Sequence, residues 1–277
     1  MKIYKTSRGL VVERHSDLFL SSEPDWDTFV NRPDLYQQVL QHIKKLKPDP
    51  TLSDAIRTGL QTPIGRQEIW ASGITYARSR QAYTEESKTG KDLYAQVYEA
   101  ERPELFFKSL SYRTVGSGEA VRIRKDSNLN VPEAELTLFI CHDGSVQGYT
   151  IGNDVSSVDI EGENPLYLAQ AKSFDASTAL GPCLYVPKGQ IDPDTMIQIE
   201  VTNNGENIFF GEISISRMKR THAELVEYLF LETSFPYGVF LMTGTGIVPP
   251  DGFALKEGDE IRISIDGIGT LMNYVRL

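Results

Sequence analysis

Hydrophobic positions recur with two different periods along the chain, and these periods predict two structural regions. Residues 1–65 alternate only briefly before apolar residues recur three and four positions apart. This spacing predicts a short strand, a polar loop and a helix from Asp34 to Lys45, which must end before Pro48 and Pro50. Because this segment shows no chemistry-bearing cluster, we expect a small, mostly structural N-terminal α/β domain.

Residues 66–277 contain one more helical stretch, predicted from Ser79 to Ala100, and then change to short alternating runs. A period of two is typical of strands with one buried face. Hairpin turns with positive φ angles favour the residue pairs that separate these runs, namely Asp143-Gly144, Asn204-Gly205 and Asp266-Gly267. We therefore predict an α+β fold that is mostly β, with a β-rich C-terminal domain over residues 66–277.

Composition and charge exclude several classes of protein. With 40% hydrophobic and 24% charged residues, the chain should be fully folded. A formal net charge of -10 argues against nucleic-acid binding, which needs clustered lysine and arginine, but a metal could still admit an anionic small molecule. We expect a cytoplasmic protein with no membrane partner, because no secretory signal or membrane-length apolar run is visible. Cys141 and Cys183 are expected to be buried structural thiols.

The strongest chemical signal is a set of carboxylates around the first predicted hairpin. Glu133 and Glu135 lie two apart, so a strand would aim both at one point, and the hairpin would bring Asp154 back to them. Three converging carboxylates repel one another unless a cation neutralises them, and all-oxygen ligands suit magnesium, manganese or calcium. The alternative is that two alternating glutamates simply form a solvated strand face.

The residues around these carboxylates resemble the fumarylacetoacetate hydrolase superfamily from about Ile69 to the C-terminus. The matching segments, in chain order, are Gly73-Ile74-Thr75-Tyr76, Phe106-Phe107-Lys108-Ser109, the Glu133 to Asp154 hairpin, Lys172-Ser173-Phe174-Asp175, Leu180-Gly181-Pro182 and Thr243-Gly244-Thr245-Gly246. The resemblance implies a fold with a fumarylacetoacetate hydrolase-like catalytic domain. It also implies that Glu133, Glu135 and Asp154 bind Mg²⁺, or Ca²⁺ or Mn²⁺, which holds a small 2-oxo acid substrate.

One departure from the family pattern indicates the reaction. Hydrolytic members carry a histidine where this chain has Ser79, and serine without a base cannot generate hydroxide near neutral pH. The sequence around Ser79 and Arg80 resembles the branch of this superfamily that dehydrates 2-keto-3-deoxy sugar acids. The resemblance thus implies a metal-dependent hydro-lyase that converts a 2-keto-3-deoxy-pentonate to 2-oxoglutarate semialdehyde. Acylpyruvate hydrolysis, oxaloacetate decarboxylation and non-catalytic binding of a 2-oxo acid remain alternatives.

The same resemblance suggests roles for further side chains. Glu104 and Lys172 are the candidates for catalytic proton transfer, although Glu104 could also be an ordinary polar loop residue beside a proline. The candidates for substrate binding are Ser79, Arg80, Thr243 and Thr245. Lys108 could be a structural ion-pair partner, and Arg80 could be solvated. The resemblance also implies a homodimer or homotetramer.

Overall fold

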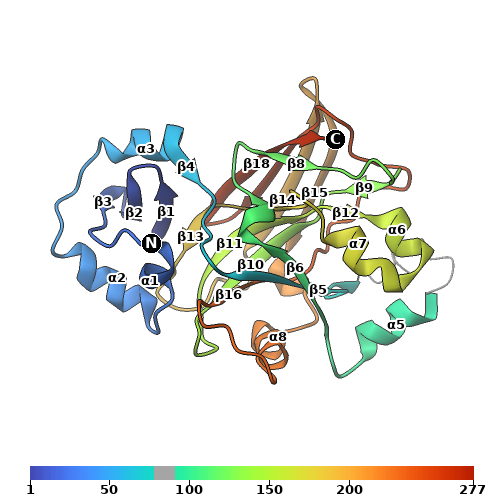
Figure 1. Ribbon diagram of the computed structural model, residues 1–277, viewed down its shortest axis with the longest axis horizontal. Helices are drawn as coiled ribbons and strands as arrows, with labels where there is room; N and C mark the ends of the chain where they lie inside the picture. The colour runs from blue at the N-terminus through green and yellow to red at the C-terminus, as the bar shows by residue number, and fades with distance from the viewer. Residues whose placement is uncertain (78–90) are drawn as a thin grey trace.

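The computed structural model describes residues 1–77 and 91–277, and within them a large β-rich body carries a smaller N-terminal lobe (Figure 1). The described strands form a larger sheet of eleven strands, a second sheet of five and a two-stranded ribbon. Side chains from the two sheets meet in one core, and a second core lies between the larger sheet and the N-terminal helices. The fold is therefore mostly β, as the sequence predicts.

The larger sheet begins in the N-terminal lobe and continues into the body. Its strands, in spatial order, are β3 (Asp17–Leu20), β2 (Gly9–Arg14), β1 (Lys2–Thr6), β13 (Thr178–Tyr185), β11 (Val146–Asp154), β10 (Ala134–Ile140), β16 (Val239–Met242), β5 (Glu68–Gly73) and β6 (Glu104–Leu110). Two short strands pair beside this path, β4 (Leu60–Gln61) with β1 and β7 (Thr114–Val115) with β13. Because β1 bonds to β13, the sheet crosses the boundary expected at residue 65, and that boundary stays a prediction.

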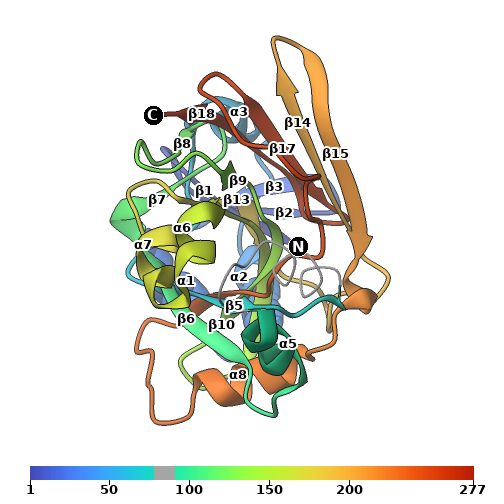
Figure 2. The same cartoon turned by 90° about the vertical axis from the view of Figure 1, so that its right-hand side faces the viewer.

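The second sheet packs against the larger one and is built mainly from two hairpins, which lie at the upper right of Figure 2. Its strands, in spatial order, are β15 (Glu206–Ser214), β14 (Met196–Asn203), β17 (Glu260–Ile265), β18 (Gly269–Arg276) and β8 (Ala120–Arg122). The two-stranded ribbon pairs β9 (Asn130–Val131) with β12 (Ser156–Ser157). All three predicted Asx-Gly hairpins are present, as β10–β11, β14–β15 and β17–β18.

The helices are short and lie around the sheets. Those described are α1 (Trp26–Val30), α2 (Leu35–Ile43), α3 (Leu52–Gly59), α5 (Lys91–Glu99), α6 (Val158–Glu163), α7 (Leu168–Lys172) and α8 (His222–Leu229), with 3₁₀ turns at Ser111–Arg113, Pro165–Tyr167 and Ile215–Arg217. None of these helices is long and apolar enough to cross a membrane. The helix predicted from Ser79 to Ala100 is described only as α5, since its beginning lies outside the described residues.

The sequence underestimates the N-terminal strands: it predicts one short strand, whereas β1, β2 and β3 form a meander. The turn between β2 and β3 is made by His15 and Ser16, whose φ angles are 49° and 71°. Glycine and asparagine are the residues that usually adopt positive φ angles in such a turn. Because this turn has neither, the sequence does not predict it. Free Cys141 and Cys183 are both buried, as expected.

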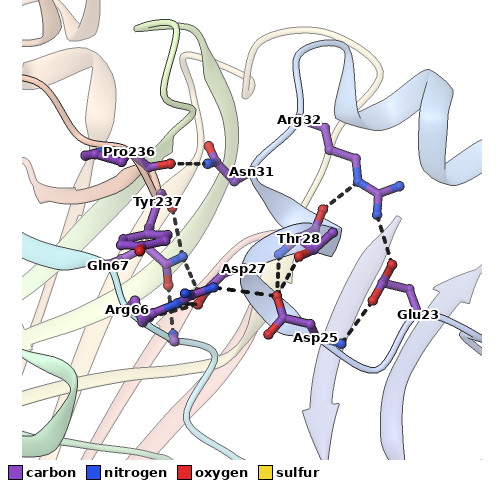
Figure 3. Close-up of polar contacts among 11 residues, drawn as sticks. Glu23, Asp25, Asp27, Thr28, Asn31, Arg32, Arg66, Gln67, Pro236 and Tyr237 are labelled. Atoms are coloured by element: carbon purple, nitrogen blue, oxygen red, sulfur yellow. Dashed lines mark hydrogen bonds and ion pairs between the residues drawn. The ribbon is translucent and has the colours of Figure 1, made fainter.

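A buried carboxylate fastens the N-terminal lobe to the body (Figure 3). Asp27 of α1 accepts hydrogen bonds from Arg66 Nε at 2.7 Å and from Gln67 Nε2 at 2.6 Å, just before β5 begins. Gln67 also donates to the carbonyl oxygen of Tyr237 at 2.9 Å, next to β16. Because β5 and β16 both lead to the candidate site, this network links the lobe to the strands that position the site.

Candidate metal centre and active site

Five neighbouring strands of the larger sheet meet at one rim, and the candidate site lies there. β10 runs antiparallel to β11 and β16, β16 runs parallel to β5, and β5 runs antiparallel to β6. Consequently β11, β16 and β5 end at the rim where β10 and β6 begin. Residues at these strand ends come together although they are distant in the sequence.

The three predicted ligands converge at this rim. Glu133 and Glu135 stand at the start of β10, and the backbone N–H of Asp154 donates to the carbonyl oxygen of Glu133 at 3.0 Å. One carboxylate oxygen from each residue lies within 4.8 Å of the others, and all three side chains are buried. The solvated-face alternative is therefore wrong for this strand.

The loop after β16 supplies a backbone donor to the cluster. Gly244 N–H donates to Glu135 Oε2 at 2.5 Å. Gly244 has a φ of +87°, and a Cβ there would lie 2.2 Å from Thr75 Oγ1, so only glycine fits this turn. The Thr-Gly-Thr-Gly segment therefore aims a backbone N–H at a buried carboxylate.

The two threonines of this segment have different surroundings. Thr243 donates its hydroxyl to the carbonyl oxygen of Leu136 at 2.8 Å and does not line the cavity described below. This hydrogen bond joins the loop to β10, and substrate binding by Thr243 stays a prediction. Thr245 does line the cavity.

Two buried lysines contact the carboxylates. Lys172, at the end of α7, lies 2.8 Å from Glu133 Oε2 and also donates to Ser156 Oγ at 2.6 Å. Lys108 is fully buried and lies 2.5 Å from Asp154 Oδ1, so its structural ion-pair interpretation agrees with the geometry. Its Nζ also donates to the carbonyl oxygens of Val155 and Lys172. Burial lowers the pKa of Lys108, while Asp154 raises it.

The residues present fit a hard divalent cation. The three side chains offer only oxygen, which magnesium and calcium prefer. Without a cation, burial raises the pKa of Glu135 well above its usual range, and the negative charges of Asp154 and Glu133 raise it further. A cation among these oxygens would remove that penalty, so the donor set and its electrostatics both suit a metal.

A cavity opens onto these ligands and is lined by two further carboxyl groups, those of Glu104 and Glu161. Glu104 begins β6 opposite Gly73 of β5, where a Cβ would lie 2.0 Å from Glu104 Oε2. Glycine therefore makes room for this carboxyl group. Burial raises the pKa of Glu104, Lys172 lowers it and Glu133 raises it.

The sequence analysis did not identify Glu161. It belongs to Val158-Asp159-Ile160-Glu161-Gly162-Glu163, where three acidic residues occur within six positions. Nothing in this pattern separates Glu161 from its neighbours, yet Glu161 is 6% exposed and faces the cavity, while Glu163 is exposed. Only the packing of α6 against the rim distinguishes them.

A second, mostly apolar cavity adjoins the first and shares Glu133 and Thr245 with it. Its walls include Val131, Ile247 and Phe253. Ser79 and Arg80, which the sequence suggests as substrate contacts, lie outside the described residues.

The chain matches the family model described as Fumarylacetoacetate (FAA) hydrolase C-terminal over residues 69–276. It is 45% identical over 214 residues to a probable 2-keto-3-deoxyxylonate dehydratase of Haloferax volcanii, and the match covers 77% of this chain and 73% of the relative. It is 40% identical over 218 residues to the 2-dehydro-3-deoxy-D-arabinonate dehydratase of Saccharolobus solfataricus, with the same coverage of 77% and 73%.

The fold is similar over nearly the whole chain to a solved 2-keto-3-deoxy-D-arabinonate dehydratase complexed with magnesium and 2,5-dioxopentanoate. The TM-score is 0.84 at 31% identity, covering 100% of this chain and 99% of the solved one. The family expected from the residue motifs is confirmed by this match and by the family model. The chain belongs to the fumarylacetoacetate hydrolase family.

Proposed function

We propose that this protein is a magnesium-dependent dehydratase that converts a 2-keto-3-deoxy-pentonate to 2,5-dioxopentanoate, also called 2-oxoglutarate semialdehyde. The observation that carries the proposal is the buried cluster of Glu133, Glu135 and Asp154, which opens into the same cavity as Glu104. The two dehydratases at 45% and 40% identity support the reaction, and the solved relative with magnesium and 2,5-dioxopentanoate supports the cofactor and the product.

The ligands have one chemical purpose in this proposal. A divalent cation held by them would polarise the 2-keto group of the substrate and make its C3 protons more acidic, an effect worth several kcal/mol of barrier. The buried setting strengthens this electrostatic effect, because little water reaches the carboxylates to screen it.

The remaining residues move protons and orient the substrate. Glu104 takes a proton from C3, and its raised pKa makes it a stronger base than an ordinary glutamate once it is ionised. Lys172 holds Glu133 in place and puts an ammonium group beside the charge that develops on the keto oxygen. Thr245 lines the substrate cavity, and Ser79 and Arg80 stay in the proposal on the family resemblance alone.

A substrate assay tests the proposal. The purified protein is incubated with magnesium and a 2-keto-3-deoxy-pentonate, and release of an aldehyde product is followed. Glu133→Gln should weaken magnesium binding, measured by calorimetry, and abolish turnover, while Glu163→Gln on the exposed side of α6 should change neither. Magnesium binding without turnover of any 2-keto-3-deoxy-pentonate would contradict the proposal.

The proposal also includes a cytoplasmic location and a homodimer or homotetramer. Sedimentation velocity measures the assembly directly, and a monomer at micromolar concentration would contradict that part.

A further inference from the structure

The product named above demands more proton transfers than the removal of water alone. Loss of a C3 proton and the C4 hydroxyl leaves a conjugated 5-hydroxy-3-ene-2-oxo acid. To reach an aldehyde at C5, a proton must then leave C5 and another must enter C3. A protein that makes this product therefore benefits from one proton-transfer group on the C3 side and another on the C4–C5 side.

The cavity holds a second buried carboxyl group that the mechanism above does not use. Glu161 comes from α6, whereas Glu104 comes from β6, so the two groups enter one cavity from different elements. Glu161 Oε2 is fully enclosed, and within the described part of the chain no hydrogen-bond donor or acceptor reaches it. A buried carboxyl oxygen without a partner is costly, which indicates a function that offsets the cost.

The short helix that carries Glu161 is held firmly in place. The backbone N–H of Val158 donates to the carbonyl oxygen of Leu129 at 2.9 Å. Asp159 accepts from Ser127 Oγ at 2.5 Å and from the backbone N–H of Asn128 at 2.8 Å. Glu161 is therefore presented to the cavity from a fixed backbone, as a proton-transfer group requires.

We propose that Glu161 is the second catalytic acid and base, which protonates the departing C4 hydroxyl and then removes the proton from C5. This inference rests on the proposed function and deepens it, because it assigns the steps that follow removal of the C3 proton. Glu104 and Glu161 divide the work, one acting at C3 and the other at C4 and C5.

The cycle balances in atoms and charges. In the elimination the C3–H bond breaks and its proton passes to ionised Glu104, while the C4–O bond breaks and the leaving oxygen takes a proton from neutral Glu161 to form water. In the second step ionised Glu161 removes a C5 proton, and Glu104 returns its proton to C3. The resulting enol at C4–C5 becomes the aldehyde when its hydroxyl proton moves to C4, so both carboxyl groups end as they began.

The electrostatics of Glu161 agree with this order of events. Burial raises the pKa of Glu161 to about 8, with Lys172 opposing the shift and Glu133 adding to it. Glu161 therefore carries a proton near neutral pH, as a first-step acid must, and becomes an effective base once it has released that proton.

The test uses the full-length protein with magnesium and compares Glu161→Gln with the matched control Glu163→Gln on the same helix. On a 2-keto-3-deoxy-pentonate, Glu161→Gln should lower kcat about 100-fold or more, the usual size of a general acid–base contribution. Magnesium affinity measured by calorimetry should be unchanged, and Glu163→Gln should match the wild type in both measurements.

A fluorinated analogue separates a catalytic role from a structural one. Fluoride leaves C4 without needing a proton, so Glu161→Gln should release fluoride from the 4-deoxy-4-fluoro analogue within roughly threefold of the wild-type rate. Aldehyde formation should nevertheless stay slow, and the conjugated enone should accumulate as a new ultraviolet absorbance.

Each result decides the inference. Fluoride release that falls as far as water elimination would show that Glu161 only supports the fold of the site. Turnover of the pentonate by Glu161→Gln near the wild-type rate would remove Glu161 from the mechanism while leaving the proposed dehydratase intact. Absence of wild-type turnover would refute the proposed function, and this inference with it.

Discussion

Replacing Lys108 with methionine tests whether the site depends on a buried charge pair. The Lys108 ammonium group is fully buried 2.5 Å from Asp154 Oδ1, and methionine fills similar volume without charge. Without Lys108, the nearest remaining ammonium group to Asp154 is that of Lys172, at 3.6 Å. Breaking a buried ion pair by removing one partner typically costs about 3–5 kcal/mol. The carbonyl oxygen of Lys172 keeps a donor in Ser177 Oγ at 2.8 Å, so the charge on Asp154 should dominate the loss.

The assay is urea unfolding followed by the fluorescence of Trp26 and Trp70, first with a chelator and then with magnesium. Without metal, Lys108→Met should lose about 3–5 kcal/mol of unfolding free energy. Magnesium should recover more stability in the variant than in the wild type, because the cation also neutralises Asp154. The exposed lysine variant Lys256→Met should stay within about 0.5 kcal/mol of the wild type in both conditions.

A double-mutant cycle identifies the partner. Lys108→Met combined with Asp154→Asn should be less destabilised than the two single losses added together, because the second substitution removes the charge that lost its nearest partner in the first. Additive losses, or a Lys108→Met protein as stable as the wild type, would refute the view that this pair holds the site together.

Two further predictions concern Glu104 and the metal ligands. Gly73→Ala would place a Cβ 2.0 Å from Glu104 Oε2 and push that flexible carboxyl group aside, so kcat should fall at least about tenfold. Magnesium affinity and unfolding free energy should stay near wild type, and an unchanged kcat would show that Glu104 needs no such positioning. The pKa of Glu135 is raised in the folded, metal-free protein from the ordinary 4.5, so the folded state binds this proton more tightly than the unfolded state does. The metal-free protein should therefore lose unfolding free energy as pH rises above the ordinary glutamate range, and saturating magnesium should abolish this loss. Urea unfolding at about pH 5 and about pH 8, with and without magnesium, measures both effects. The same change in unfolding free energy between the two pH values in both conditions would contradict the prediction.

The elements that carry local signals could be predicted from the sequence. The β10–β11 hairpin follows from Asp143-Gly144 and its flanking apolar runs, and it suffices to bring Asp154 back to Glu133 and Glu135. The β2–β3 hairpin could not be predicted, because His15 and Ser16 adopt positive φ angles that these residue types rarely take.

Features that depend on packing between distant segments could not be predicted from the sequence. Thr243 and Thr245 are two residues apart in a strand-like stretch, yet only the structure shows that Thr243 donates its hydroxyl to the carbonyl oxygen of Leu136. Glu161 looks like any acidic residue of a polar helix until the packing of α6 encloses its carboxyl group. A local sequence pattern indicates which side chains can come together, whereas tertiary packing determines which of them are enclosed and which polar atoms they bond.

The balance of charge in the site explains how an acidic chain admits an acidic substrate. Five carboxyl groups, those of Glu104, Glu133, Glu135, Asp154 and Glu161, share the site with the ammonium groups of Lys108 and Lys172. In the resting site of the proposed cycle Glu161 is neutral, because burial raises its pKa to about 8, whereas Glu104 is the ionised base. Four carboxylates then face two ammonium groups, an excess of two negative charges. A divalent cation balances this excess, and its own positive charge is available to attract the carboxylate of a 2-oxo acid. Metal should therefore bind before substrate, and substrate affinity measured by calorimetry should be lost when a chelator removes the metal. The bound cation thus explains how a chain with a formal charge of -10 can bind an acidic substrate.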